Sequence, residues 1–183
     1  MRTPTTASGK GFTLIELMVG TAVLAILLSI AVPAFDNILY DSMRSSSVNA
    51  FVHTIFLARS EAMNRSQMIS VCGSSDGTTC RKAGAEWNTG WIVFVNHDRD
   101  EPPVHDDDEP IVFVQGPWPQ GRIRANRTAF SFRPHSRGVV NGTVVFCDPR
   151  GSSTARAVII NSAGRPRVSQ RDASNRPLSC PGS

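Results

Sequence analysis

A long apolar run near the beginning of the chain is the strongest pattern in the sequence. Residues 12–35 are apolar or small apart from Glu16, which carries the only charge. As an α-helix rising about 1.5 Å per residue, this run would reach about 36 Å, enough to cross the hydrocarbon core of a bilayer. Residues 1–11 are polar, include Arg2 and Lys10, and lack the apolar centre of a secretory signal peptide. The pattern therefore predicts a membrane-spanning helix at residues 12–35.

The next segment is amphipathic rather than uniformly apolar. Pro33 predicts a kink, because proline removes a backbone hydrogen bond from a helix interior. Beyond it, apolar residues recur at steps of three and four, namely Phe35, Ile38, Leu39, Val48, Phe51, Val52, Ile55, Ala58 and Ala62. We expect the helix to continue through residues 36–65 and to pack its apolar side against a globular head.

From residue 66 onward, the pattern is typical of short strands. Runs rich in β-formers are separated by Gly, Pro, Asp and Asn, at residues 68–72, 90–95, 111–115, 129–133, 142–147 and 155–161. Residues 162–168 have the pattern of a turn followed by an extended run. The prediction is an α+β fold, in which a long N-terminal helix is followed by an antiparallel β-sandwich or sheet in one head of residues 66–183.

The residues at the start of the apolar run carry a resemblance. The sequence Gly11-Phe12-Thr13-Leu14-Ile15-Glu16-Leu17 resembles the N-terminal signal of type IV prepilins and pseudopilins. The resemblance implies that residues 1–11 are a leader, that a prepilin peptidase cuts between Gly11 and Phe12, and that the new amino group of Phe12 is methylated. It gives Glu16 a partner for assembly, the Phe12 amino group of a neighbouring subunit. The alternative is an ordinary membrane anchor whose Glu16 lies near the surface.

The same resemblance implies a location and a set of partners. The subunit would cross the inner membrane once with its head in the periplasm, and would then enter a pilus fibre at the cell surface. Other pilins would contact it through the N-terminal helix.

The cysteines are compatible with an exported head. There are four, all beyond the apolar half of the chain, and they allow three pairings. We favour Cys72 with Cys80, across a turn-rich segment, and Cys147 with Cys180. A zinc site is the competing interpretation, but no pair has the short Cys-x-x-Cys spacing typical of such sites.

Charge is distributed unevenly along the chain. Residues 12–115 hold 6 basic and 13 acidic side chains, whereas residues 116–183 hold 11 arginines, no lysine and only Asp148 and Asp172. The acidic residues concentrate at 98–101 and 106–109. Such a cluster offers oxygen ligands to calcium, but it lacks the spacing of an EF-hand and is interrupted by two prolines, so a solvated loop is the favoured interpretation.

The arginine-rich half predicts a phosphate-bearing partner. A guanidinium binds phosphate through two parallel hydrogen bonds and stacks on bases, which an ammonium does not do. Gly164 allows a tight turn and Pro166 keeps Arg165 extended, so Arg165 and Arg167 are expected to face the same way. Arg171 and Arg176 continue the basic stretch. The alternative is a solvated hairpin in an arginine-rich sequence.

A narrower resemblance covers the C-terminal half. The stretches FCDPRG and ARAVIINSAGRPR, followed by a late cysteine, resemble the FimT/GspH family of minor pilins and pseudopilins. Within them, Gly164-Arg165-Pro166-Arg167 matches the GRxR pattern of FimT-type pilins, which implies non-specific DNA binding through Arg165, Arg167, Arg171 and Arg176 during natural transformation. The alternative is a structural minor pilin, or a GspH-like pseudopilin, for fibre initiation or type II secretion.

Catalysis is the least favoured class of function. The four histidines are scattered, and no catalytic or nucleotide-binding motif occurs in the sequence. We therefore expect a protein that is not an enzyme and has no cofactor or metal. Trp87, Trp91 and Trp118 are candidates for stacking on bases, although tryptophans beside strands more often fill a core.

Overall fold

The computed structural model describes residues 11–81, 86–134 and 141–180, which form two compact units divided after Asp41. Helix α1 (Leu14–Arg65) is 52 residues long and continues through Pro33. In the first unit almost every side chain is exposed, and the helix is long and apolar enough to cross a membrane by length and composition. Its N-terminus has reciprocal capping: the Thr13 N–H donates to Glu16 Oε2 at 3.4 Å, and the Glu16 N–H donates to Thr13 Oγ1 at 3.3 Å.

In the second unit, the remainder of α1 buries one side. The buried residues recur at helical spacing and are Arg44, Val48, Phe51, Thr54, Ile55, Ala58 and Ala62. Of the apolar residues expected on this side, those from Val48 to Ala62 are buried or, for Val52, partly buried, whereas Phe35, Ile38 and Leu39 are exposed. Sequence reasoning missed the two polar members of this face, Arg44 and Thr54.

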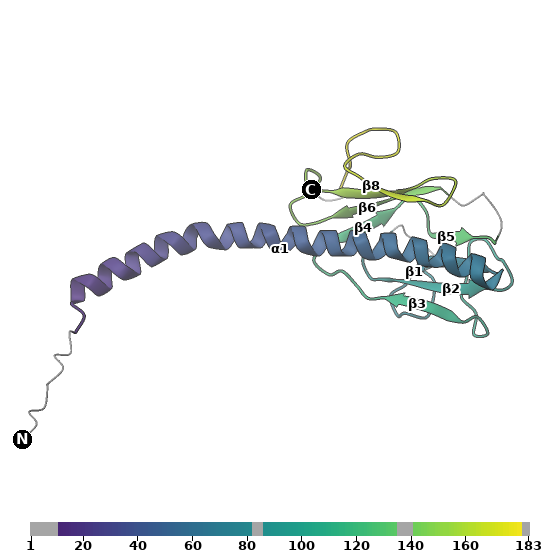
Figure 1. The fold of residues 1–183 in the computed structure, drawn as a ribbon, viewed down its shortest axis with the longest axis horizontal. Coiled ribbons are helices and arrows are strands. Elements are labelled where there is room, and N and C mark those ends of the chain that lie inside the picture. Colours follow the sequence, from purple (N-terminus) through teal and green to yellow (C-terminus); the bar gives the residue numbers. More distant parts are fainter. Residues whose placement is uncertain (1–10, 82–85, 135–140, 181–183) are drawn as a thin grey trace, which may run out of the picture. The chain divides into compact units, whose positions relative to one another are not determined.

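The head contains two four-stranded antiparallel sheets (Figure 1). Sheet A has the order β3-β2-β1-β5, with β1 (Met68–Gly73), β2 (Trp91–Asn96), β3 (Ile111–Gln115) and β5 (Ala129–Phe132). Sheet B has the order β4-β6-β7-β8, with β4 (Arg122–Ala125), β6 (Gly142–Cys147), β7 (Arg156–Ile160) and β8 (Pro166–Ser169). All six predicted strands are present within two residues of their expected ends, and the predicted turn and extended run become the β7–β8 connection and β8.

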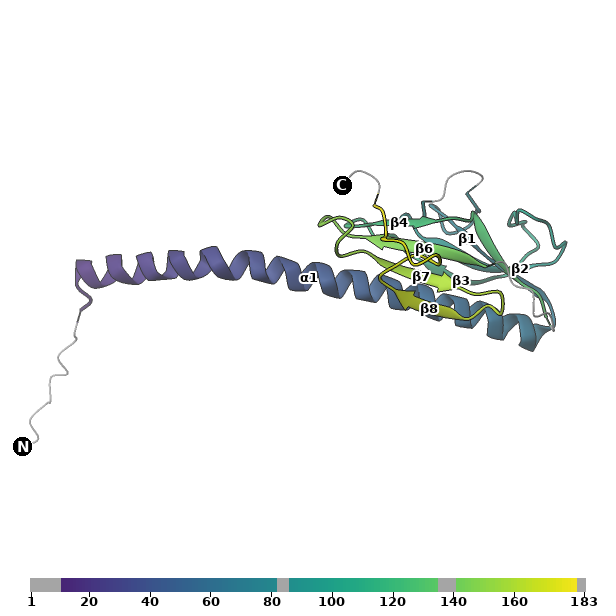
Figure 2. The same ribbon diagram turned by 90° about the horizontal axis from the view of Figure 1, so that it is seen from above.

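Aromatic side chains join the helix to both sheets. The Phe51 ring makes edge contacts with Trp91 and Phe130 from sheet A and with Phe146 from sheet B, at centroid distances of 5.4, 6.2 and 5.9 Å. The indole N–H of Trp91 donates to the Thr54 hydroxyl at 3.0 Å. One hydrophobic core thus lies between this part of α1 and the two sheets. The ribbon in Figure 2 shows this part of α1 running alongside the strands.

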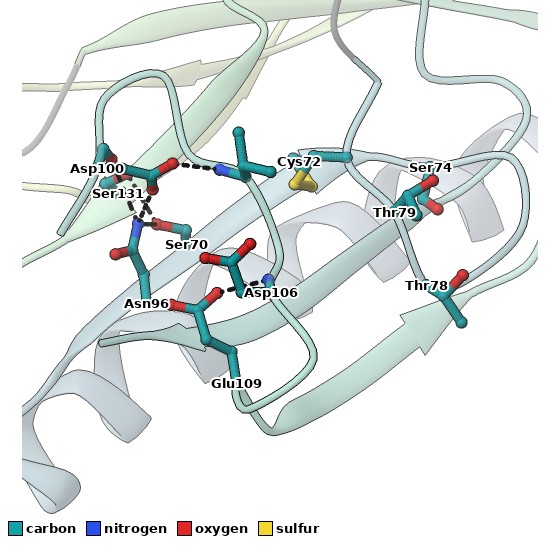
Figure 3. Close-up of a disulfide and its surroundings, with 12 residues drawn as sticks. Ser70, Cys72, Ser74, Thr78, Thr79, Asn96, Asp100, Asp106, Glu109 and Ser131 are labelled. Atoms are coloured by element: carbon teal, nitrogen blue, oxygen red, sulfur yellow. Dashed lines mark hydrogen bonds between the residues drawn. A yellow bond between two sulfur atoms is a disulfide. The ribbon is translucent and has the colours of Figure 1, made fainter. Parts of the chain in front are cut away.

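Two acidic residues of the β2–β3 connection, Asp100 and Glu109, accept hydrogen bonds from its own backbone (Figure 3). Asp100 accepts hydrogen bonds from the Asn96 amide at 3.0 Å and the Val104 N–H at 2.8 Å. The buried Glu109 accepts the N–H groups of His97 and Asp106, at 2.7 and 3.1 Å. Among the described residues, no group of three or more His, Cys, Asp or Glu side chains is arranged to hold a metal ion.

Both favoured disulfides are present. Cys72 is bonded to Cys80, and Cys147 to Cys180, so these thiols are not zinc ligands. The first disulfide closes a loop organised by Asp76, whose carboxylate accepts hydrogen bonds from the Thr79 hydroxyl at 2.6 Å and from the N–H groups of Thr79 and Thr78. These bonds hold the pKa of Asp76 well below its usual range.

Candidate nucleic-acid interface

Sheet B has an inner face in the core and an outer face that carries arginines. Along β4, Ile123 and Ala125 are buried while Arg122 and Arg124 are exposed, as strand alternation requires. Arg122 lies opposite Cys147, and Arg124 lies opposite Val145, both on the outer face. At the other edge, Arg167 of β8 lies opposite Ile159, on the same outer face. Arginines from both edge strands therefore belong to one side of the sheet.

The turn between β7 and β8 is held by a dense set of hydrogen bonds. The Asn161 side-chain oxygen accepts the N–H groups of Ala163 and Arg165, each at 3.0 Å, and the Asn161 N–H donates to the Arg165 carbonyl at 3.2 Å. Gly164 has a φ of 70°, which favours glycine at this position. Arg59 of α1 also donates to the carbonyl of Ala163. The turn is consequently fixed both internally and against the helix.

Arg165 and Arg167 are the two predicted residues whose guanidiniums are wholly open to a ligand. Both are exposed, and neither guanidinium has a hydrogen-bond or ion-pair partner among the described residues. Arg167 lies within β8, whereas Arg165 closes the turn before it, beside Phe56 and Met63 of α1. That the two side chains share one face stays a prediction.

Arg171 and Arg176 are instead used within the C-terminal tail. The Arg171 guanidinium donates to the carbonyl of Asn175 at 3.0 Å, and Arg176 Nε donates to Asp172 Oδ2 at 2.8 Å. The Arg176 N–H also donates to the Asp172 carboxylate. This backbone bond is the main cause that lowers the pKa of Asp172, with the Arg176 side chain adding to it.

The tail lies on the outer face of sheet B. Leu178 and Cys180 pack against Ala157, Ile159 and Cys147, which form a small cluster separate from the main core. The Cys180 N–H donates to the Ser152 hydroxyl at 3.0 Å. The tail therefore covers the apolar centre of this face, with arginines on the strands at its two edges.

A buried ion pair closes the end of β6. Asp148 accepts hydrogen bonds from Arg44 at 2.6 Å and Arg150 at 2.7 Å through Oδ2, and from the Thr154 hydroxyl at 2.9 Å through Oδ1. Burial raises the pKa of Asp148, but the bonds from Arg150 and Thr154 and the charge of Arg150 outweigh it and lower the pKa to about 2. Sequence reasoning missed this cluster, although Asp148 belongs to the quoted FCDPRG stretch.

The three tryptophans are buried, and two of the histidines make contacts within the head. Trp87 and Trp91 are 1% and 2% exposed and lie in the core, and Trp118 is also buried, so their rings are not available to stack on bases. His53 contacts the Phe113 ring, and His105 Nε2 is 2.8 Å from the carbonyl oxygen of Glu109. His135 lies outside the described residues.

An apolar N-terminal helix followed by a head of two antiparallel sheets, with a basic face and no catalytic motif, defines a pilin-like protein. The family model described as Type II transport protein GspH matches residues 47–164, well over half of the chain, and the chain belongs to this family. The prokaryotic N-terminal methylation motif matches residues 7–32.

Solved structures have a similar fold. Two crystal forms of the type IV minor pilin FimU from Pseudomonas aeruginosa PAO1 are similar in fold, with TM-scores of 0.55 and 0.53 and 17% sequence identity. Each alignment covers 74% of this chain, and 98% and 93% of the FimU chains. No curated protein sequence matches. The chain is therefore a subunit of the minor pilin and pseudopilin class.

Proposed function

We propose that this subunit is a minor type IV pilin whose head binds DNA without sequence preference during DNA uptake in natural transformation. The proposal rests on the exposed guanidiniums of Arg165 and Arg167, which have no carboxylate partner within the described part of the chain. Their positive charge would neutralise backbone phosphates and release condensed counterions, which is the main source of non-specific affinity for DNA.

The fixed turn strengthens this proposal. Because Asn161 and Arg59 already hold the backbone around Gly164, little backbone entropy remains to be lost when a ligand binds. Arg171 and Arg176 each use one guanidinium hydrogen bond to hold the tail loop in shape, and their other N–H groups remain as donors to DNA. Base contacts are not part of the mechanism, and we expect binding to depend on salt rather than on sequence.

The rest of the proposed life cycle follows from the N-terminal motif. A prepilin peptidase removes residues 1–11 by cutting after Gly11, and Phe12 is methylated. The helix spans the inner membrane once with the head in the periplasm until Glu16 pairs with the amino group of a neighbouring subunit's Phe12 and the subunit enters the fibre.

A salt series on the full chain in detergent tests DNA binding. Each phosphate contact that is lost should reduce the slope of log K against log salt by about 0.9 on duplex DNA. Arg165→Gln with Arg167→Gln should therefore flatten the slope by about 1.8, weaken binding at low salt and reduce DNA uptake.

A matched control removes the same charge elsewhere. Arg65→Gln with Arg133→Gln takes two exposed arginines from outside sheet B, where they pair with Glu61 and Glu101. The control should keep the slope of the wild type. Identical slopes for the wild type and the Arg165/Arg167 variant would remove the DNA role.

A second candidate is favoured by the family and fold comparisons. A structural minor pilin for fibre initiation, or a pseudopilin for type II secretion, belongs to the same class as GspH and FimU. In that case Arg165 and Arg167 would contact neighbouring subunits, and the same double variant would reduce fibre assembly or secretion while leaving DNA binding unchanged.

A further inference from the structure

A groove on the outer face of sheet B carries a second group of arginines. It lies between β4 and β6 on one side and the tail loop of residues 172–176 on the other, and is lined by Arg124, Arg127, Arg176, Thr143, Ser174 and Asp172. Only Arg176 among these arginines was assigned to DNA from the sequence.

The three guanidiniums are positioned in different ways. Arg127 donates through Nε to the carbonyl of Asn141 at 3.1 Å and through Nη2 to its side-chain oxygen at 3.4 Å, and Arg176 is held through Nε by Asp172. Arg124 is exposed and has no side-chain partner among the described residues. Each guanidinium thus retains terminal N–H donors for a ligand.

The charges lining the groove select an anion. Asp172 is its one acidic group among the described lining residues, and the hydrogen bonds from Arg176 keep that carboxylate ionised, so three arginines leave a net charge of +2. Hydroxyls of Thr143 and Ser174 and guanidinium forks are donors suited to phosphate oxygens. The opening lies on the surface that also carries Arg167.

We propose that this groove is a second phosphate-binding site, so that DNA crosses the outer face of sheet B from β8 to β4. The inference rests on the proposed DNA binding and extends it to residues outside the tail. Three strand spacings separate β8 from β4, about 14 Å in all. That span is comparable with the width of a DNA major groove, so a single DNA segment reaches phosphates at both edges.

The test compares two pairs of arginines on the full chain in detergent, with duplex DNA as the probe. Arg124→Gln with Arg127→Gln should flatten the salt slope by about 1.8, as the Arg165/Arg167 pair does, and the fourfold variant should flatten it by about 3.6. Arg124→Gln alone, which breaks no internal hydrogen bond among the described residues, should flatten it by about 0.9. The Arg65/Arg133 control should leave it unchanged.

The outcomes separate the two claims. If the Arg165/Arg167 variant loses slope while Arg124→Gln and the Arg124/Arg127 variant keep the wild-type slope, the groove is not a phosphate site and the DNA role stands. If the wild type shows no salt-dependent binding, both fail. Binding of inorganic phosphate or anionic vesicles, with loss in the Arg124/Arg127 variant but no binding of DNA, would assign the groove to another phosphate source and overturn the proposal.

Discussion

At the scale of single residues, Asp148 joins three separate parts of the head. It accepts hydrogen bonds from α1 through Arg44, from the following turn through Arg150, and from Thr154 before β7. Its side chain is 1% exposed, so losing any one partner leaves charge in a poorly solvated place. The residue therefore matters for stability even though it lies outside the proposed binding surface.

We predict that Asp148→Asn lowers the free energy of unfolding by about 3 kcal/mol at pH 7, because the neutral amide breaks the ion pairs that the buried carboxylate makes with Arg44 and Arg150. The pH profile should change as well. The pKa of Asp148 is depressed to about 2 in the folded state, so its stabilisation is full above pH 4 and is lost as the pH falls to about 2, a change of about 2 kcal/mol. Urea unfolding across this range measures both effects.

A control and a contrary result define this test. Asp107→Asn, in the exposed part of the β2–β3 connection, should change neither the stability at pH 7 nor the loss of stability between pH 4 and pH 2. If Asp148→Asn still loses as much stability as the wild type between pH 4 and pH 2, other groups cause that loss.

Residue-level contacts were only partly predictable from the sequence. The exposure of Arg165 and Arg167 was expected because glycine and proline mark a turn there. The pairing of Arg176 with Asp172 was missed because four-residue spacing is informative on a helix but not in a loop. Arg44 and Asp148 are 104 residues apart, and only the tertiary fold brings them together.

At the scale of elements, strand length decided what the sequence could predict. Six strands have apolar or β-branched runs of sufficient length, and the sequence predicted their first and last residues to within two positions. Strand β4 was missed because it has four residues, two of them arginines, although the alternation of Arg122 and Arg124 with buried Ile123 and Ala125 was a usable signal. Missing β4 also hid the second half of the arginine-bearing face.

The tail is an element held by a covalent bond, and this leads to a prediction about stability. Removing the Cys147–Cys180 disulfide by Cys→Ala changes at both positions should lower the free energy of unfolding by about 4 kcal/mol, because its loop spans 33 residues. Removing Cys72–Cys80, whose loop spans 8 residues, should cost about 2.5 kcal/mol and serves as the matched comparison. Denaturant unfolding of both variants gives the ranking, and the reverse order would contradict it.

At the scale of the whole molecule, the two charged halves of the sequence have different uses. In the acidic half, Asp100 and Glu109 accept backbone N–H groups of their own loop, between β2 and β3. The basic half is spread over sheet B, with several guanidiniums left open to solvent. Net charge alone predicted a basic region in the second half of the chain, and its use in binding phosphate stays a proposal; the role of Asp100 and Glu109 needed the conformation of the loop.

Assembly into a fibre leads to a prediction about the first turn of α1. Glu16→Ala should fold and insert into the membrane but fail to enter fibres, because it removes the charge that we propose pairs with the amino group of a neighbouring subunit. Thr13→Ala is the matched control, since it removes the hydroxyl of the reciprocal cap and keeps the carboxylate. Immunoblots of sheared fibres measure incorporation. Normal incorporation of Glu16→Ala would contradict the assembly role.

The Cys147–Cys180 disulfide has a mechanical consequence for any bound ligand. Strands β7 and β8 and the turn between them all lie inside the loop that it closes. A pull on a polymer held at Arg165 can peel β8 from β7, but the slack released is limited by the stretch of fifteen Cα-to-Cα steps from Arg165 to Cys180. Fully stretched, they reach about 50 Å, after which the load passes through the covalent link to β6 and the core of the head.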